Sequence, residues 1–242
     1  ICAAGPIEKE AFHYFNGEID LALQNLLEIK AENDPVWNEY VARCYWIILK
    51  ETEDKKNRKD LEKKFVDFID AAIKISKNNF QKTESAPDAY DFIMASSIKS
   101  AFLAEKKEYR ASAQILDRII NAMEFCINNG FDLVYLPLGA AQFKVSQNIG
   151  GWSLGSLGKR LAYKMFTPSR LYKRIRIDEE EAIRFVEIAS LYQDAPEFRR
   201  IEAFFVLQNI LLEYHDKNSG NHDKDFEIFI ILNELNQKFP QN

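Results

Sequence analysis

Residues 15–35 read FNGEIDLALQNLLEIKAENDP, and this stretch decides the fold class. Its apolar residues recur at the three- and four-residue spacing of a helix, from Ile19 to Leu27. Gly17 precedes this helix in an Asn-Gly pair typical of a tight reversal, because glycine adopts a positive φ at little cost. At the other end, Asp34 is expected to cap the next helix and Pro35 to occupy its first position. The stretch therefore predicts a helix with a short turn at each end, leading to a further helix on each side.

The same pattern continues along the chain. No segment alternates polar and apolar residues as a strand does, and only nine glycines and seven prolines punctuate the 242 residues, too few for a sandwich or barrel. A charged stretch at residues 51–60 is expected to separate two helices, and Pro137 is tolerated only near a first turn. The sequence predicts an all-α chain of about ten to twelve helices. Besides the helices on either side of Gly17, the expected helices cover residues 35–49, 61–75, 89–104, 109–127, 131–145, 179–192, 196–214 and 226–239.

Composition and charge narrow the class of protein. Hydrophobic residues make up 47% of the chain and charged residues 29%, which are ordinary values for a globular protein. The formal net charge of −5 argues against nucleic acid as the partner of the whole chain. No apolar run approaches the roughly 18 residues that a membrane-spanning helix needs. We expect one helical domain over residues 1–242, with an irregular insert at about 146–178.

Helices that arrive in short-linked pairs invite a search for repeats. Short motifs that contain small and large apolar residues recur near fixed offsets at several places. These motifs are Gly17, Ala22, Leu26 and Pro35; Tyr40-Val41-Ala42; Lys107-Glu108-Tyr109 with Leu116; Leu138-Gly139; and Glu181-Ala182-Ile183 with Val186 and Ala189. In these motifs the chain resembles a degenerate tetratricopeptide-repeat (TPR) protein. It is similar to exported bacterial TPR proteins of undefined function. The resemblance implies a TPR-like superhelical array of antiparallel helix pairs with an irregular central insert, which presents a concave surface to peptides and carries no chemistry of its own.

If the motifs align in this way, the inner face of the array carries a set of candidate partner-binding residues. Arginine beside aromatic residues in a groove is the composition of a peptide-binding hot spot. The alternative is that the two aromatic members of the set belong to the core, and the assignments shift with the register of the repeats. The candidates are Glu39, Arg43 and Trp46 from the second unit, Phe143 and Lys144 from the fourth, and Asn209 from the sixth.

The insert ends in the strongest charge asymmetry of the chain. Seven basic residues and no acidic residue lie between 159 and 176, and without their +7 the rest of the chain carries −12. With interleaved aromatic residues, this segment suits an anionic membrane surface or an acidic partner. The alternative is internal pairing with the acidic run at 178–181, which follows directly. The seven residues are Lys159, Arg160, Lys164, Arg170, Lys173, Arg174 and Arg176.

Catalytic and metal-binding patterns are missing from the sequence. No Ser/His/Asp or Cys/His arrangement has a recognisable spacing, and the three cysteines, Cys2, Cys44 and Cys126, form no spaced pair. We therefore expect no enzyme activity, no metal site and no cofactor.

The start of the chain bears on the compartment. The sequence begins without Met, and Cys2 is a candidate for a lipid-carrying cysteine, although Ile1 is bulkier than the residue that such processing sites usually have. Export to the periplasm or cell envelope is expected, with a cytoplasmic location as the alternative.

The sequence favours a non-catalytic protein- or peptide-binding scaffold, with the bacterial cell envelope as its expected location. Two alternatives stay open: a helical carrier of a small molecule or lipid, closed by residues 150–176, and a peripheral membrane component that uses the basic segment 159–176. The identity of a protein partner is not predicted.

Overall fold

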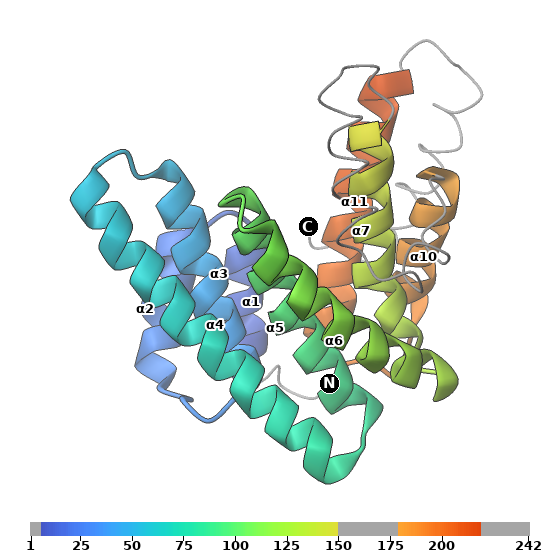
Figure 1. Cartoon of the computed structure of the whole chain (residues 1–242), viewed down its shortest axis with the longest axis horizontal. Coiled ribbons are helices and arrows are strands. Elements are labelled where there is room, and N and C mark those ends of the chain that lie inside the picture. The colour runs from blue at the N-terminus through green and yellow to red at the C-terminus, as the bar shows by residue number, and fades with distance from the viewer. Residues whose placement is uncertain (1–5, 150–178, 219–242) are drawn as a thin grey trace. The chain divides into compact units, whose positions relative to one another are not determined.

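A computed structural model describes residues 6–149 and 179–218 of the chain, and these residues form helices without any strand (Figure 1). This confirms the predicted all-α class. The elements are α1 (Pro6–Phe15), α2 (Ile19–Ile29), α3 (Pro35–Glu51), α4 (Lys55–Thr83), α5 (Ala86–Glu105), α6 (Tyr109–Asn128), a 3₁₀ turn η1 (Asp132–Val134), α7 (Tyr135–Ile149), α10 (Glu179–Leu191) and α11 (Glu197–Asn218).

The described residues divide into two compact units, which we describe separately. The first contains α1 to α6 with η1 and ends at Val134, and the second contains α7, α10 and α11 and begins at Tyr135. The expectation of a single domain over the whole chain stays a prediction.

In the first unit each helix packs on the next one in the sequence, from α1 through α6. The links between these helices are short, so that consecutive helices run antiparallel. Figure 1 shows the long helix α4 running beside both α3 and α5, as their contacts require. Because α5 returns along α4, the C-terminal end of α5 lies close to the N-terminal end of α4. This return brings together the residues of the candidate site.

Local capping explains where α3 begins. The Asp34 carboxylate accepts hydrogen bonds from the backbone N–H groups of Val36 (2.7 Å) and Trp37 (3.1 Å), and Pro35 is the first helical residue. These bonds satisfy N–H groups that have no partner within the helix. The predicted cap is confirmed.

Two helix-to-helix turns in the first unit have the same backbone geometry. Gly17 between α1 and α2 has φ 80°, and Lys107 between α5 and α6 has φ 64°. The following residues, Glu18 and Glu108, have ψ 55° in both turns and φ of −83° and −84°. The backbone hydrogen bonds of the turns match as well, with Glu18 N–H bound to the His13 carbonyl at 2.9 Å and Glu108 N–H bound to the Leu103 carbonyl at 2.8 Å. The chain therefore builds two equivalent helical hairpins.

A small residue is buried at the equivalent position in the second helix of each hairpin. Ala22 in α2 is completely buried. Ser112 occupies the equivalent position in α6, and its hydroxyl lies 2.8 Å from that of Ser100 in α5. Ser112 also donates to the Ser100 carbonyl at 3.0 Å. Small side chains let two helices meet without a gap or a clash.

The structure corrects two expected boundaries. The charged stretch at 51–60 does not separate helices along its whole length, because α4 begins at Lys55 and extends to Thr83 instead of covering 61–75. Four of the six residues from 55 to 60 are lysine or arginine, which have good helix propensity and remain solvated on this exposed turn. The helix expected at 131–145 begins instead at Tyr135, after the 3₁₀ turn η1. Pro137 then lies in the first turn of α7, as anticipated.

Aromatic side chains fill the space between α3, α4 and α5. Trp37 and Tyr45 of α3 both pack on Phe68 of α4, with ring centroids 5.6 and 5.8 Å apart. Phe65 of α4 lies between α3 and α5, with its ring centroid 4.4 Å from that of Phe102. This cluster holds three helices at fixed distances around the candidate site.

The second unit pairs two helices that are separated in the sequence by residues 150–178. α7 packs on α10, and a Cβ built on Gly139 of α7 would lie only 2.7 Å from the carbonyl oxygen of Ala182 and from Val186 Cγ2. Only glycine fits this contact. α10 packs in turn on α11. The expected helix at 226–239 and most of the expected insert lie outside the described residues.

Candidate binding site

Two of the predicted groove residues form a buried ion pair on α3. Arg43 Nη2 lies 2.6 Å from Glu39 Oε1, with side chains 11% and 1% exposed. The Arg43 guanidinium also lies over the Tyr40 ring, 5.2 Å from its centroid. The expectation that Glu39 is exposed in an open groove is therefore wrong. Each charge of the pair neutralises the other, which makes burial of both side chains tolerable.

The predicted partner-binding residues in the compact unit that begins at Tyr135 have different environments. Phe143 is 1% exposed, so that its expected exposure is wrong and the alternative assignment to the core applies. Asn209 is exposed on α11. The side chain of Lys144 lies outside the described residues, as do all seven basic residues between 159 and 176.

Among the residues predicted to bind a partner, Trp46 lines a pocket in the described part of the chain. This pocket, called here the Trp46 pocket, has a volume of about 230 Å³ and lies where α3 ends, α4 begins and α5 ends. Trp46 is half-buried and packs on Phe65 and Phe102, with centroids 5.7 and 6.3 Å away. The residues that line the pocket are Trp46, Leu49, Lys50, Arg58, Glu62, Phe102, Glu105 and Lys106.

A lysine covers each aromatic ring of the pocket. Lys50 Nζ lies 4.2 Å from the Trp46 ring centroid and 3.1 Å from Glu105 Oε1. Lys106 Nζ lies 5.5 Å from the Phe102 ring centroid and forms an ion pair with Glu62. The Lys50 and Glu105 side chains are 52% and 53% exposed. Ion pairs as exposed as this contribute little to stability, so that these lysines move away from the rings at small cost.

Arg58 joins the two helices at the wall of the pocket. Its Nη1 donates to the carbonyls of Leu49 (2.9 Å) and Thr52 (2.7 Å). These carbonyls belong to the last turn and the C-cap of α3, where the helix leaves acceptors without intrahelical partners. The guanidinium therefore fixes the wall of the pocket.

The size and lining of the pocket limit its chemistry. Small-molecule pockets usually enclose about 300–1,000 Å³. The Trp46 pocket is smaller, and its volume suits one side chain of a partner. Its two carboxylates are half-exposed and each is paired with a lysine, so that neither has the environment of a catalytic acid or base.

Residues 6–149 and 179–218 show neither a grouped set of metal ligands nor a membrane-spanning helix. Within these ranges, no three His, Cys, Asp or Glu side chains are grouped as a metal ion requires. No described helix is both long enough and apolar enough to cross a membrane.

Comparisons of the chain with protein-family models, curated proteins and solved structures return no significant match.

Sequence reasoning identified Trp46 but missed the other residues of its pocket. Trp46 and Lys50 are four positions apart, as are Arg58 and Glu62, and this spacing places each pair on one helix face. The sequence therefore contained a signal for these two pairs. What the sequence could not supply was the return of α5, which brings Phe102, Glu105 and Lys106 to the same place.

Proposed function

We propose that the chain is a non-catalytic, TPR-like scaffold that binds a peptide segment of a protein partner in the Trp46 pocket. The observation that carries the proposal is the pocket itself: a half-buried tryptophan with a free volume of about 230 Å³ beside it. Partly buried aromatic side chains in a small pocket are the usual anchors of protein–protein recognition.

The two equivalent hairpins support the TPR-like part of the proposal. TPR-like arrays repeat a pair of antiparallel helices whose contact is closed by small residues. Ser112 occupies such a contact with Ser100, and Ala22 is buried at the equivalent position behind a turn of the same geometry. Gly139 makes a similarly close contact between α7 and α10.

Binding at this pocket requires Lys50 to leave the Trp46 ring. Its side chain is half-exposed, and its carboxylate partner within the described residues is the equally exposed Glu105. An aromatic or aliphatic side chain of a partner would bury more of the indole face than the lysine does, and removal of this apolar surface from water favours the exchange.

The test is a selection of defined peptides. A library of random twelve-residue peptides, displayed on phage, is selected on the immobilised full chain, and the enriched peptides are synthesised with a fluorescent label. We expect anisotropy titrations to give an affinity for Trp46→Leu about tenfold or more below that of the parent chain, because the indole surface is lost.

The matched control is Phe80→Leu. Phe80 is also half-buried, but it packs on Phe125 at the other end of α4, with centroids 5.0 Å apart. We expect this variant to bind the selected peptides as the parent chain does. Equal binding by Trp46→Leu, with an unchanged circular dichroism spectrum, would contradict the proposed site. Failure to enrich any peptide would contradict the peptide-binding function.

A further inference from the structure

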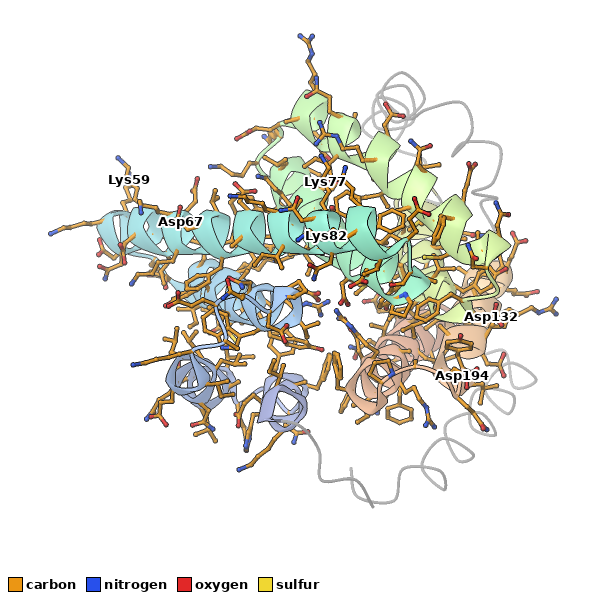
Figure 2. All side chains as sticks on the ribbon, turned by 90° about the horizontal axis from the view of Figure 1, so that it is seen from below. Lys59, Asp67, Lys77, Lys82, Asp132 and Asp194 are labelled. Carbon is orange, nitrogen blue, oxygen red and sulfur yellow. The ribbon has the colours of Figure 1, made fainter. Side chains whose placement is uncertain are left out.

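Three exposed lysines lie on the first turns of α4, beside the Trp46 pocket. Lys55 and Lys59 each precede a pocket-lining residue by three positions, and residues three apart are neighbours on a helix surface. Lys56 lies between them in the sequence and is exposed as well. Figure 2 shows Lys59 projecting from this end of α4. The pocket therefore has a basic border.

These lysines differ from the other lysines of the same segment. Lys63 pairs with Asp67 and Lys64 pairs with Asp60, both at 2.8 Å. Hydrogen bonding to these carboxylates raises the pKa of both lysines. Among the described residues, no carboxylate lies within ion-pair distance of Lys55, Lys56 or Lys59, so that their charges are available to a partner.

The position of these lysines is unfavourable for the helix backbone, and the Asp54 carboxylate, which caps α4, is the one acidic group at its N-cap. The N-terminal end of a helix carries partial positive charge from its backbone, which disfavours cations in the first turn. α4 has no acidic residue in its first turn. The segment Lys55–Lys64 holds six basic and two acidic residues, a net charge of +4 in a chain whose total is −5. This charge exceeds that of the three carboxylates of Glu51, Glu53 and Asp54, which directly precede the segment. The excess, placed on the first turns of α4, suits an anionic partner.

We infer that the partner segment is an acidic peptide, an inference that rests on the peptide-binding function proposed above. One apolar side chain of the peptide enters the Trp46 pocket. Its aspartate or glutamate side chains pair with Lys55, Lys56 and Lys59. Charges at the rim of an interface act over a distance, so they accelerate association and select the partner by charge.

The experiment uses the same peptide selection, on the full chain, with a count of charged residues in the enriched peptides. We expect the peptides that depend on Trp46 to be richer in Asp and Glu than the unselected library. We also expect Lys55→Glu/Lys59→Glu to bind them about tenfold or more weakly at low salt. Raising the ionic strength to about 0.5 M should weaken binding to the parent chain and reduce the difference between the two proteins.

The control carries the same charge change on the same helix. Lys74→Glu/Lys77→Glu alters two exposed lysines away from the pocket, and Figure 2 shows Lys77 well separated from Lys59 along α4. We expect this control to retain most of the affinity. Folding of the test variant is not at risk, because glutamate near a helix N-terminus is favourable.

The outcomes separate this inference from the function on which it rests. Trp46-dependent peptides of neutral or basic composition would overturn the inference and leave the proposed function intact. So would acidic peptides that bind Lys55→Glu/Lys59→Glu and the parent chain equally well. An absence of Trp46-dependent peptides would overturn both.

Discussion

A single glycine decides how closely α7 approaches α10. The Cβ of an alanine at position 139 would lie 2.7 Å from the Ala182 carbonyl oxygen and 3.1 Å from Phe185 Cβ. The oxygen belongs to the backbone of α10, so relief requires a shift of the helix. Overpacking of this kind costs about 1–3 kcal/mol, against a helix-propensity gain of up to about 1 kcal/mol. We expect Gly139→Ala to lower the free energy of unfolding by about 1–2 kcal/mol, measured by urea denaturation.

Gly130 provides the comparison. It has φ 69°, and nothing lies within 4 Å of its built Cβ. Asparagine tolerates this left-handed conformation, so Gly130→Asn should change the unfolding free energy by less than about 1 kcal/mol. A Gly139→Ala protein as stable as the parent chain would show that α7 and α10 are farther apart than the 2.7 Å contact requires.

At the scale of an element, the turn between α5 and α6 contains a strained residue. Lys107 occupies the position that Gly17 holds in the equivalent turn, with φ 64°. A residue with a side chain pays about 1–2 kcal/mol in this left-handed region, while glycine adds about 0.5–1 kcal/mol of unfolded-state entropy. We expect Lys107→Gly to raise the unfolding free energy by a few tenths to about 1 kcal/mol in urea denaturation.

The neighbouring lysine should respond in the opposite direction. Lys106 has φ −75° and ψ 0°, an ordinary right-handed conformation. Glycine relieves no strain there, and Lys106→Gly should lower the unfolding free energy by about 0.5–1 kcal/mol. If both substitutions shift stability in the same direction, the turn geometry does not explain the effect.

At the scale of the whole molecule, the first unit has a core of its own. Its helices α1 to α6 bury Tyr40, Phe65 and Ile93, and residues 1–134 are long enough for an independent domain. Both described cysteines, Cys44 and Cys126, are buried in this unit, and burial raises the pKa of each thiol to about 12. The thiolate is the reactive form, so both should be unreactive at pH 8.

We expect a fragment of residues 1–134 to fold alone, with helical circular dichroism. In a Cys2→Ser background, its two remaining thiols should react with Ellman's reagent at pH 8 only after urea is added. The unfolded fragment in urea provides the reference rate. Immediate reaction of both thiols without urea would show that the fragment does not form this core.

Stability of the same unit should fall at alkaline pH. The thiols titrate near pH 9 when unfolded and near pH 12 when folded, so the unfolded state loses its protons first as the pH rises. Their contribution is complete below about pH 9 and declines above it. A Cys44→Ala/Cys126→Ala variant should therefore show a shallower loss of unfolding free energy between pH 9 and 11 than the parent chain. Parallel pH profiles would contradict this linkage.

Helix positions were largely determined by the sequence, because the signals that set them are local. α3 begins at Pro35 since the Asp34 side chain reaches backbone N–H groups only two and three residues away. α6 begins at the predicted Tyr109 behind a turn closed by hydrogen bonds within a few residues. The start of α4 at Lys55 differs from the predicted start at 61 because a charged stretch resembles a linker in sequence, although a solvated helix turn satisfies the same residues equally well.

Pairing and burial were decided only by the tertiary structure. Gly139 was recognised as part of a repeat motif, but its contact with Ala182 depends on α7 meeting α10 across residues 150–178. Glu39 is a charged residue of the kind expected in an exposed groove. It is nevertheless buried, because Arg43 neutralises its charge and the packing around α3 covers its side chain. The Trp46 pocket needs the ends of three helices at once. A sequence pattern reports which face of a helix is apolar, whereas long-range packing decides what covers that face.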